Sequence, residues 1–147
     1  HAFFVEISEL RRGIEPEAAR LAASRASMDA GLELKAMAMR LQELGLQGRG
    51  AEKEFLEIDK NFHARLLECS SNEIFGHMAS LIESLLTERT YWQLQPAFPS
   101  SDAMAAHVRL ADSIVRRDAD GAWVAASFIV SQAEEEVRAS DGEAERR

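Results

Sequence analysis

The sequence predicts an all-α protein, an antiparallel bundle of six to seven helices. Apolar residues recur at spacings of three and four along nearly the whole chain, which is the period of a helix with one buried face. No alternating apolar and polar run of useful length indicates a strand. The 147 residues include only eight glycines and three prolines, which fall mostly between the apolar stretches. The connections between the apolar stretches are short, and short connections favour an antiparallel arrangement of consecutive helices.

Six apolar stretches give the predicted helices. Their approximate ranges, in chain order, are 3–26, 28–45, 51–69, 73–92, 101–115 and 119–137. Pro16 is expected to kink or divide the first helix because it lacks the N–H of an intrahelical hydrogen bond, and a division would give seven helices. Side-chain oxygens suited to N-caps precede four of the helices, at Ser27, Asn72, Ser101 or Asp102, and Asp118.

Composition narrows the class of protein. Seventeen basic and twenty-five acidic residues give a formal net charge of −8, which disfavours a nucleic-acid-binding surface on this chain. The single cysteine, Cys69, excludes a disulfide framework and favours a cytoplasmic protein. No apolar run approaches the roughly 20 residues of a membrane span, so no membrane partner is expected.

The chain is expected to form one domain. This domain comprises residues 1–140, and residues 141–147 are expected to form a frayed polar tail. The His1 start suggests that the chain begins inside a longer protein.

Asp59 and His63 are the first candidate functional residues. They are four residues apart among Phe55, Phe62 and Leu66, so the two side chains share one inward helix face. A carboxylate and an imidazole at this spacing can chelate one divalent ion. An ordinary Asp–His hydrogen bond within a helical core accounts for the same pattern.

His107 lies on the apolar stripe of the fifth predicted helix, between Met104 and Ala111. It is either a satisfied core histidine or a ligand. The second interpretation requires the fifth helix to approach the third, which periodicity does not show.

Arg11 and Arg89 border the apolar stripes of the first and fourth helices. A guanidinium near a pocket can hold a carboxylate through two parallel hydrogen bonds. Alternatively each arginine extends to solvent or forms an ion pair, for example Arg11 with Glu15.

Five short motifs occur in a characteristic order. They are ELRRGIEPEAARLAA at residues 9–23, D-x-x-F-H at Asp59–His63, the Ser71–Asn72 helix start, HVRLADSI at residues 107–114 (with Ser113 where alanine is usual), and RDADGA at residues 117–122. Together they resemble the C-terminal effector domain, the FCD domain, of GntR-type transcription regulators in the fatty-acid-regulator subfamily. The resemblance extends over nearly the whole chain.

The resemblance implies a helical bundle that forms a homodimer and binds a small carboxylic acid. It also implies an N-terminal winged helix-turn-helix domain, absent from this sequence, that would contact operator DNA. The candidate effector-binding residues are Arg11, Arg89, Asp59, His63, His107 and Asn72.

Many members of the family hold a metal through one aspartate and three histidines. Asp59, His63 and His107 match three of these positions, whereas Ile129 occupies the fourth. Three protein ligands plus water or an effector carboxylate can hold Zn²⁺ or a similar divalent ion. A metal-free pocket is the alternative within the same subfamily.

The predicted function is ligand sensing without chemistry on the ligand, and therefore not an enzyme. A bound acid would shift the population between two arrangements of the helices. Two other classes of protein remain: a metal-dependent helical-bundle hydrolase that uses Asp59, His63 and His107, and a structural dimerisation module with a filled core.

Overall fold

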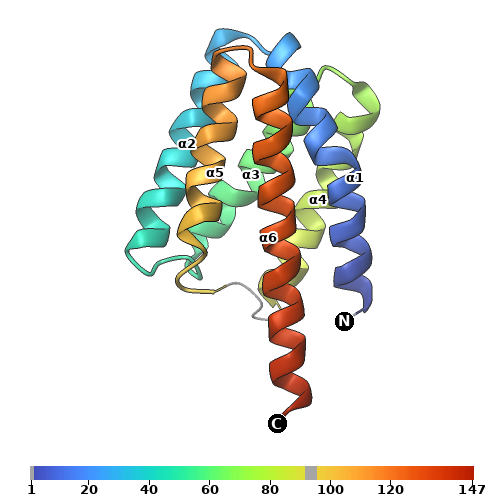
Figure 1. The fold of residues 1–147 in the computed structure, drawn as a ribbon, viewed down its shortest axis with the longest axis vertical. Helices are drawn as coiled ribbons and strands as arrows, with labels where there is room; N and C mark the ends of the chain where they lie inside the picture. The colour runs from blue at the N-terminus through green and yellow to red at the C-terminus, as the bar shows by residue number, and fades with distance from the viewer. Residues whose placement is uncertain (1, 92–95) are drawn as a thin grey trace.

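The structure is a computed structural model that describes the backbone of residues 2–91 and 96–147, with the side chains of residues 4–87, 96–140, 142–143 and 145–147. The described chain forms six helices and no strand (Figure 1). The helices are α1 (Ala2–Arg25), α2 (Met28–Leu46), α3 (Lys53–Cys69), α4 (Glu73–Tyr91), α5 (Ser101–Val115) and α6 (Ala119–Glu145). The all-α bundle is therefore confirmed.

Helix α1 runs through Pro16 without a break, so the described helices number six rather than seven. Pro16 is buried, and so are Ala18 and Ala19 that follow it. Loss of one intrahelical hydrogen bond is outweighed when the rest of the helix packs against its neighbours.

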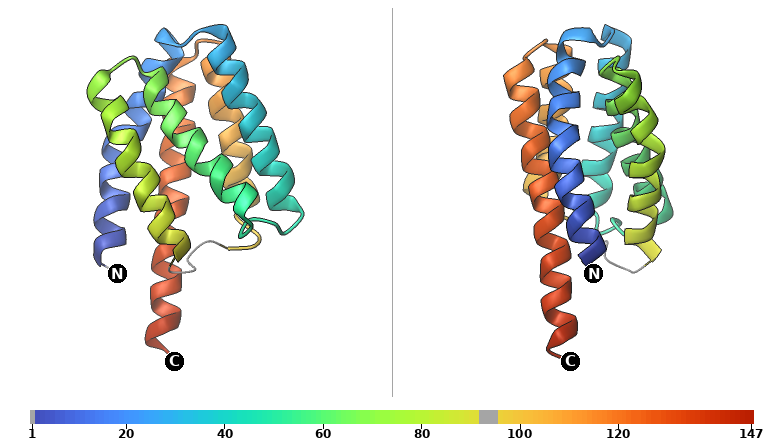
Figure 2. Two further views of the ribbon diagram at one scale, coloured as in Figure 1. Left: turned by 180° about the vertical axis from the view of Figure 1, so that it is seen from behind. Right: turned by 90° about the vertical axis from the view of Figure 1, so that its right-hand side faces the viewer.

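The helices pack in pairs around a common interior. Helix α1 lies beside α6, α2 beside α5, and α3 beside α4 (Figures 1 and 2). The main apolar core lies between α1, α2, α3, α5 and α6, and a smaller cluster joins α1, α3 and α4. None of the described helices is long and apolar enough to cross a membrane.

Most of the predicted N-caps are confirmed. Ser27 accepts a hydrogen bond from the N–H of Ala30, and Asp118 accepts one from Gly121. At α5 the prediction is wrong by one residue, because Ser100 and not Ser101 or Asp102 accepts the N–H of Ala103.

The predicted end of the sixth helix is also wrong. Helix α6 continues past Val137 to Glu145, into the segment expected to be a frayed tail (Figure 1). Buried Val137 packs with Phe4 of α1, and Glu134 pairs with Arg12 of α1. These contacts with α1 stabilise α6 up to Val137, and the last turns extend beyond the other helices (Figure 1).

Candidate metal and effector site

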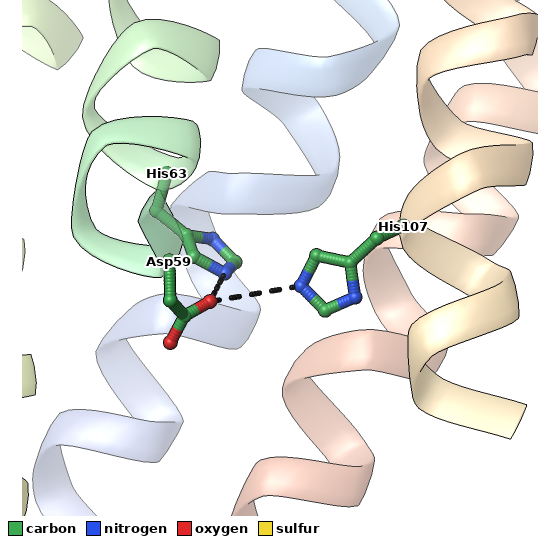
Figure 3. Close-up of side chains that lie close together, drawn as sticks. All are labelled: Asp59, His63 and His107. Atoms are coloured by element: carbon green, nitrogen blue, oxygen red, sulfur yellow. Dashed lines mark ion pairs between the residues drawn. The ribbon is translucent and has the colours of Figure 1, made fainter. Parts of the chain in front are cut away.

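Asp59 and His63 of α3 meet His107 of α5 in the interior of the bundle (Figure 3). One possible ligand atom from each residue lies within 4.8 Å of the other two. His63 Nε2 is 3.3 Å and His107 Nε2 is 3.8 Å from Asp59 Oδ1. Helices α3 and α5 are not neighbours in the bundle, so these side chains reach toward one another across its interior.

His107 presents a free nitrogen to this cluster. Its Nδ1 lies 2.7 Å from the carbonyl oxygen of Ala103, the geometry of an N–H that donates to that oxygen. Nε2 is buried and has no hydrogen-bond partner. Burial, together with the charge of His63, lowers the pKa of His107 to about 4, so the ring is neutral at pH 7. A neutral imidazole with an unused lone pair is the form that ligates metals.

His63 is held between two carboxylates. Its Nδ1 hydrogen-bonds to Glu15 of α1, and its Nε2 faces Asp59. Burial alone would lower the pKa of His63, but the two carboxylates outweigh burial and raise the pKa to about 9. Burial likewise opposes ionisation of Asp59, yet the neighbouring imidazoles and Arg11 hold the pKa of its carboxyl well below the usual range.

Arg11 is paired with Glu15, as the ion-pair alternative proposed. Arg11 Nε donates to Glu15 Oε2 at 2.5 Å, and both side chains are almost completely buried. Arg11 and His63 together overcome the effect of burial and lower the pKa of Glu15 to about 2. Without a metal, the two positive groups Arg11 and His63 balance the two negative groups Glu15 and Asp59.

Glu15 is the residue that the sequence analysis did not place in the site. Its position on the inward face of α1, one turn from Arg11, was the available signal. Its contact with His63, 48 residues along the chain, depends on the packing of α3 against α1.

A cavity of about 30 Å³ adjoins the cluster. Arg11 and the three candidate ligands line it, together with Phe55, Pro99, Ala103, Met104, Ile129, Gln132, Ala133 and Glu136. Ile129 of α6 is 4% exposed. The position that the resemblance assigns to a fourth ligand therefore does face the cavity, but its side chain has no donor atom.

Two predicted effector-binding residues are not placed at this cavity. Asn72 caps α4 by accepting the N–H groups of Ile74 and Phe75, and it borders a separate surface hollow. The structure does not bring Asn72 to the cluster. Arg89 belongs to α4, but its side chain lies outside the described residues.

The donor set fits a divalent ion such as Zn²⁺. It offers two imidazole nitrogens and one ionised carboxylate oxygen, and the free Nε2 of His107 has no other buried partner. Glu15 stands behind His63 as the outer carboxylate that orients a metal-ligating histidine.

The fold and its buried polar cluster define a helical domain with an internal polar site, and the comparisons with known proteins identify its family. The FCD domain matches residues 6–127, and the chain belongs to this family. No match was found among curated proteins.

Among solved structures, the chain is similar to Streptococcus agalactiae GntR, with a TM-score of 0.74 and 20% sequence identity. The similarity covers 90% of this chain and 58% of that one, so the chain spans little more than half of its structural relative. The resemblance to GntR-type FCD domains is thereby confirmed, and the family is one of ligand-sensing regulatory domains.

Proposed function

We propose that this chain is the effector-sensing and dimerisation domain of a cytoplasmic bacterial transcription regulator. It would bind a small carboxylate beside a divalent metal and act on operator DNA through a separate winged helix-turn-helix domain. The observation that carries the proposal is the buried, partnerless Nε2 of His107, which faces Asp59 and His63 across a cavity.

The balance of charge explains why the metal and the acid would bind together. The four ionised groups at the site sum to zero when His63 is protonated, so nothing there favours an anion. A divalent ion bound in place of the His63 proton supplies positive charge and free coordination positions. The site then carries one net positive charge, and a buried charge of this kind requires a counterion such as one carboxylate.

Each protein group has a distinct role in this proposal. Asp59, His63 and His107 hold the ion, and Glu15 fixes the ring of His63. Arg11 neutralises Glu15 and also lines the cavity, so its guanidinium would lie beside a bound acid. The cavity argues against a purely structural module with a filled core.

The site is well placed to affect the packing of the bundle. Its residues belong to α1, α3 and α5, and α6 closes the cavity. An acid with different affinities for two packings of these helices would shift the population toward one of them.

Calorimetry with Zn²⁺ on chelator-treated protein tests the metal step. We expect one ion per chain and release of a proton near pH 7. His107→Ala should weaken Zn²⁺ binding by at least about tenfold through loss of a ligand, whereas exposed His77→Ala should not. Equal Zn²⁺ affinity in His107→Ala and the parent would overturn the site.

Thermal melting with acetate, lactate and succinate tests the effector step. At least one acid should raise the melting temperature of the Zn²⁺-loaded protein and leave the chelator-treated protein unchanged. Acid binding that is equally strong without metal would contradict the proposed coupling and favour a metal-free pocket.

A further inference from the structure

The cavity beside the candidate site has one wall that is not helical. Pro99 lines the cavity and is buried, and it lies in the connection that leads into α5. Every other lining residue in the described part of the chain belongs to α1, α3, α5 or α6. Residues 96–99, which we call the strap, pass the connection between α2 and α3 at this end of the bundle (Figure 1).

Two glycines in the α2–α3 connection allow the strap to lie close to it. A Cβ at position 50 would lie 2.6 Å from the carbonyl oxygen of Pro96 and 2.8 Å from that of Ala97, shorter than any ordinary contact of a Cβ. Gly48 has a φ of 74°, and a Cβ there would overlap the ring of Phe98. The lack of side chains at Gly48 and Gly50 therefore permits the contact that holds the strap in place.

The strap is held more weakly than the helices around it. Among the described residues, a single backbone hydrogen bond joins it to the α2–α3 connection, from the N–H of Gly50 to the carbonyl oxygen of Ala97 at 2.8 Å. Phe98 is 72% exposed, so its ring loses little buried area when the strap moves. Segments with few buried apolar contacts open at a lower free-energy cost than packed helices. The strap is therefore the part of the cavity wall that we expect to open first.

The strap is also connected to the candidate ligands through the start of α5. It leads directly into Ser100, whose side chain caps α5 by accepting the N–H of Ala103. The carbonyl oxygen of Ala103 in turn accepts a hydrogen bond from Nδ1 of His107. Displacement of the strap therefore acts on the turn of α5 that orients His107.

We propose that the strap is the gate of the cavity, through which ions and small molecules reach His107 when residues 96–99 move away from Gly48 and Gly50. The inference rests on the proposed function for the identity of what enters, whereas the opening is a property of the metal-free chain. The competing route into the cavity runs along α6, where partly exposed Gln132 and Glu136 also line it.

Modification of His107 by diethyl pyrocarbonate in the metal-free protein tests the gate. This reagent reacts with neutral imidazoles, and Nε2 of His107 is buried without a partner. Gly50→Ala places a methyl group against two backbone oxygens of the strap, so the strap should be displaced and His107 should react at least about tenfold faster. Gly13→Ala is the matched control, because a Cβ at this exposed position meets no atom within 4 Å. Exposed His77 reports the activity of the reagent in each protein.

A second probe separates local opening from loss of the fold. Buried Cys69 lies at the other end of α3 from Gly50, so a thiol reagent should modify Cys69 in Gly50→Ala at the rate of the parent. Faster modification of Cys69 and His107 together would indicate global unfolding, and Phe98→Ala would then decide. This variant removes the ring that lies on Gly48 but little buried surface, so it should also speed modification of His107.

Unchanged modification of His107 in folded Gly50→Ala and Phe98→Ala proteins would overturn the gate and favour the route along α6. In the Zn²⁺-loaded protein, EDTA should remove the ion at least about tenfold faster from Gly50→Ala than from the parent or Gly13→Ala. Equal rates of removal would show that the ion leaves by another route and would also overturn the gate. A chain that binds no Zn²⁺ would remove the proposed function, while modification of His107 would still decide for or against the gate.

Discussion

At the scale of single residues, Glu15 links α1 to the candidate site. It contacts Arg11 on its own helix and His63 on α3. All three side chains are buried, and the positive charges on either side hold the carboxylate ionised. A buried ion pair adds little net stability compared with an apolar pair, but removal of one partner leaves an uncompensated charge.

Replacing Glu15 by glutamine should therefore destabilise the chelator-treated protein strongly. We expect a loss of about 3–5 kcal/mol in the free energy of unfolding, because Arg11 loses its buried counter-charge. Zn²⁺ affinity should also fall by about 10- to 100-fold because the ring of His63 loses its orienting carboxylate. Urea unfolding and calorimetry measure the two effects.

Glu17→Gln is the matched control, because Glu17 lies on the same helix and pairs with exposed Arg20. This control should leave the unfolding midpoint nearly unchanged. A Glu15→Gln protein as stable as the control would refute the proposed importance of the buried carboxylate.

The pKa shifts at the site predict how stability depends on pH when a chelator is present. The pKa of His63 is raised from 6.5 to about 9, so its contribution is complete below pH 6.5 and lost as pH rises through 9. The pKa of His107 is lowered from 6.5 to about 4 and that of Glu15 from 4.5 to about 2. Their contributions are present at neutral pH and lost as pH falls through these lower values.

Thermal melting in a chelator should therefore give the highest melting temperature near pH 6.5, with decreases toward both acid and alkali. Zn²⁺ should abolish most of the decrease between pH 6.5 and 9, because the ion replaces the proton of His63. A His77→Gln control should show the same profile as the parent. A melting temperature that stays constant from pH 6.5 to 9.5 in the chelator would contradict the assignment to His63.

At the scale of helices and turns, local signals in the sequence predicted most of the structure. Ser27, Asn72 and Asp118 cap helices as expected, because an N-cap depends on a few adjacent residues. The continuation of α6 past Val137 could not be predicted in this way, since the polar residues that follow carry no apolar stripe.

The same distinction applies to the candidate site. Four-residue spacing was enough to place Asp59 beside His63, whereas the approach of His107 required the family resemblance as well as helical periodicity. The contact of Glu15 with His63 was missed because it depends on the packing of two helices. Sequence patterns predict which residues share a helix face, but not which faces meet.

Arg117 joins the turn before α6 to the end of α1. Its guanidinium donates to the carbonyl oxygens of Ala23, Ser24 and Ala26, at 3.3, 3.1 and 2.9 Å. These carbonyls lie at or just beyond the last turn of α1, where helical partners run out.

Arg117→Ala should lower the free energy of unfolding by about 1–2 kcal/mol, because carbonyl groups at the end of α1 lose a charged donor. The adjacent exposed Arg116→Ala is the control and should have little effect. Urea unfolding of both variants measures the difference, and equal stabilities would show that the Arg117 hydrogen bonds contribute nothing measurable.

At the scale of the whole molecule, the 27-residue helix α6 has two parts, one packed within the bundle and one that extends beyond it (Figure 1). Its middle part closes the cavity with Ile129 and packs against α1 through Glu134 and Val137. Its last turns extend beyond the other helices of the bundle (Figures 1 and 2). The stability of the domain should therefore depend on the helix up to Val137 and little on the turns that follow.

Two truncations test this division of α6. Ending the chain after Ser140 removes seven residues that extend past the bundle, so the melting temperature and Zn²⁺ affinity should stay close to those of the parent. Ending it after Ala133 removes buried Glu134 and Val137. Phe4 then loses the apolar side chain that packs against it, and Arg12 loses its ion-pair partner. This shorter protein should melt many degrees lower, since it loses both apolar burial and an ion pair between α1 and α6.

If the two truncated proteins were equally stable, the contacts of α1 with this part of α6 would not contribute to the fold. If truncation after Ser140 were as damaging as truncation after Ala133, the projecting turns would have a structural role that their position outside the bundle does not explain.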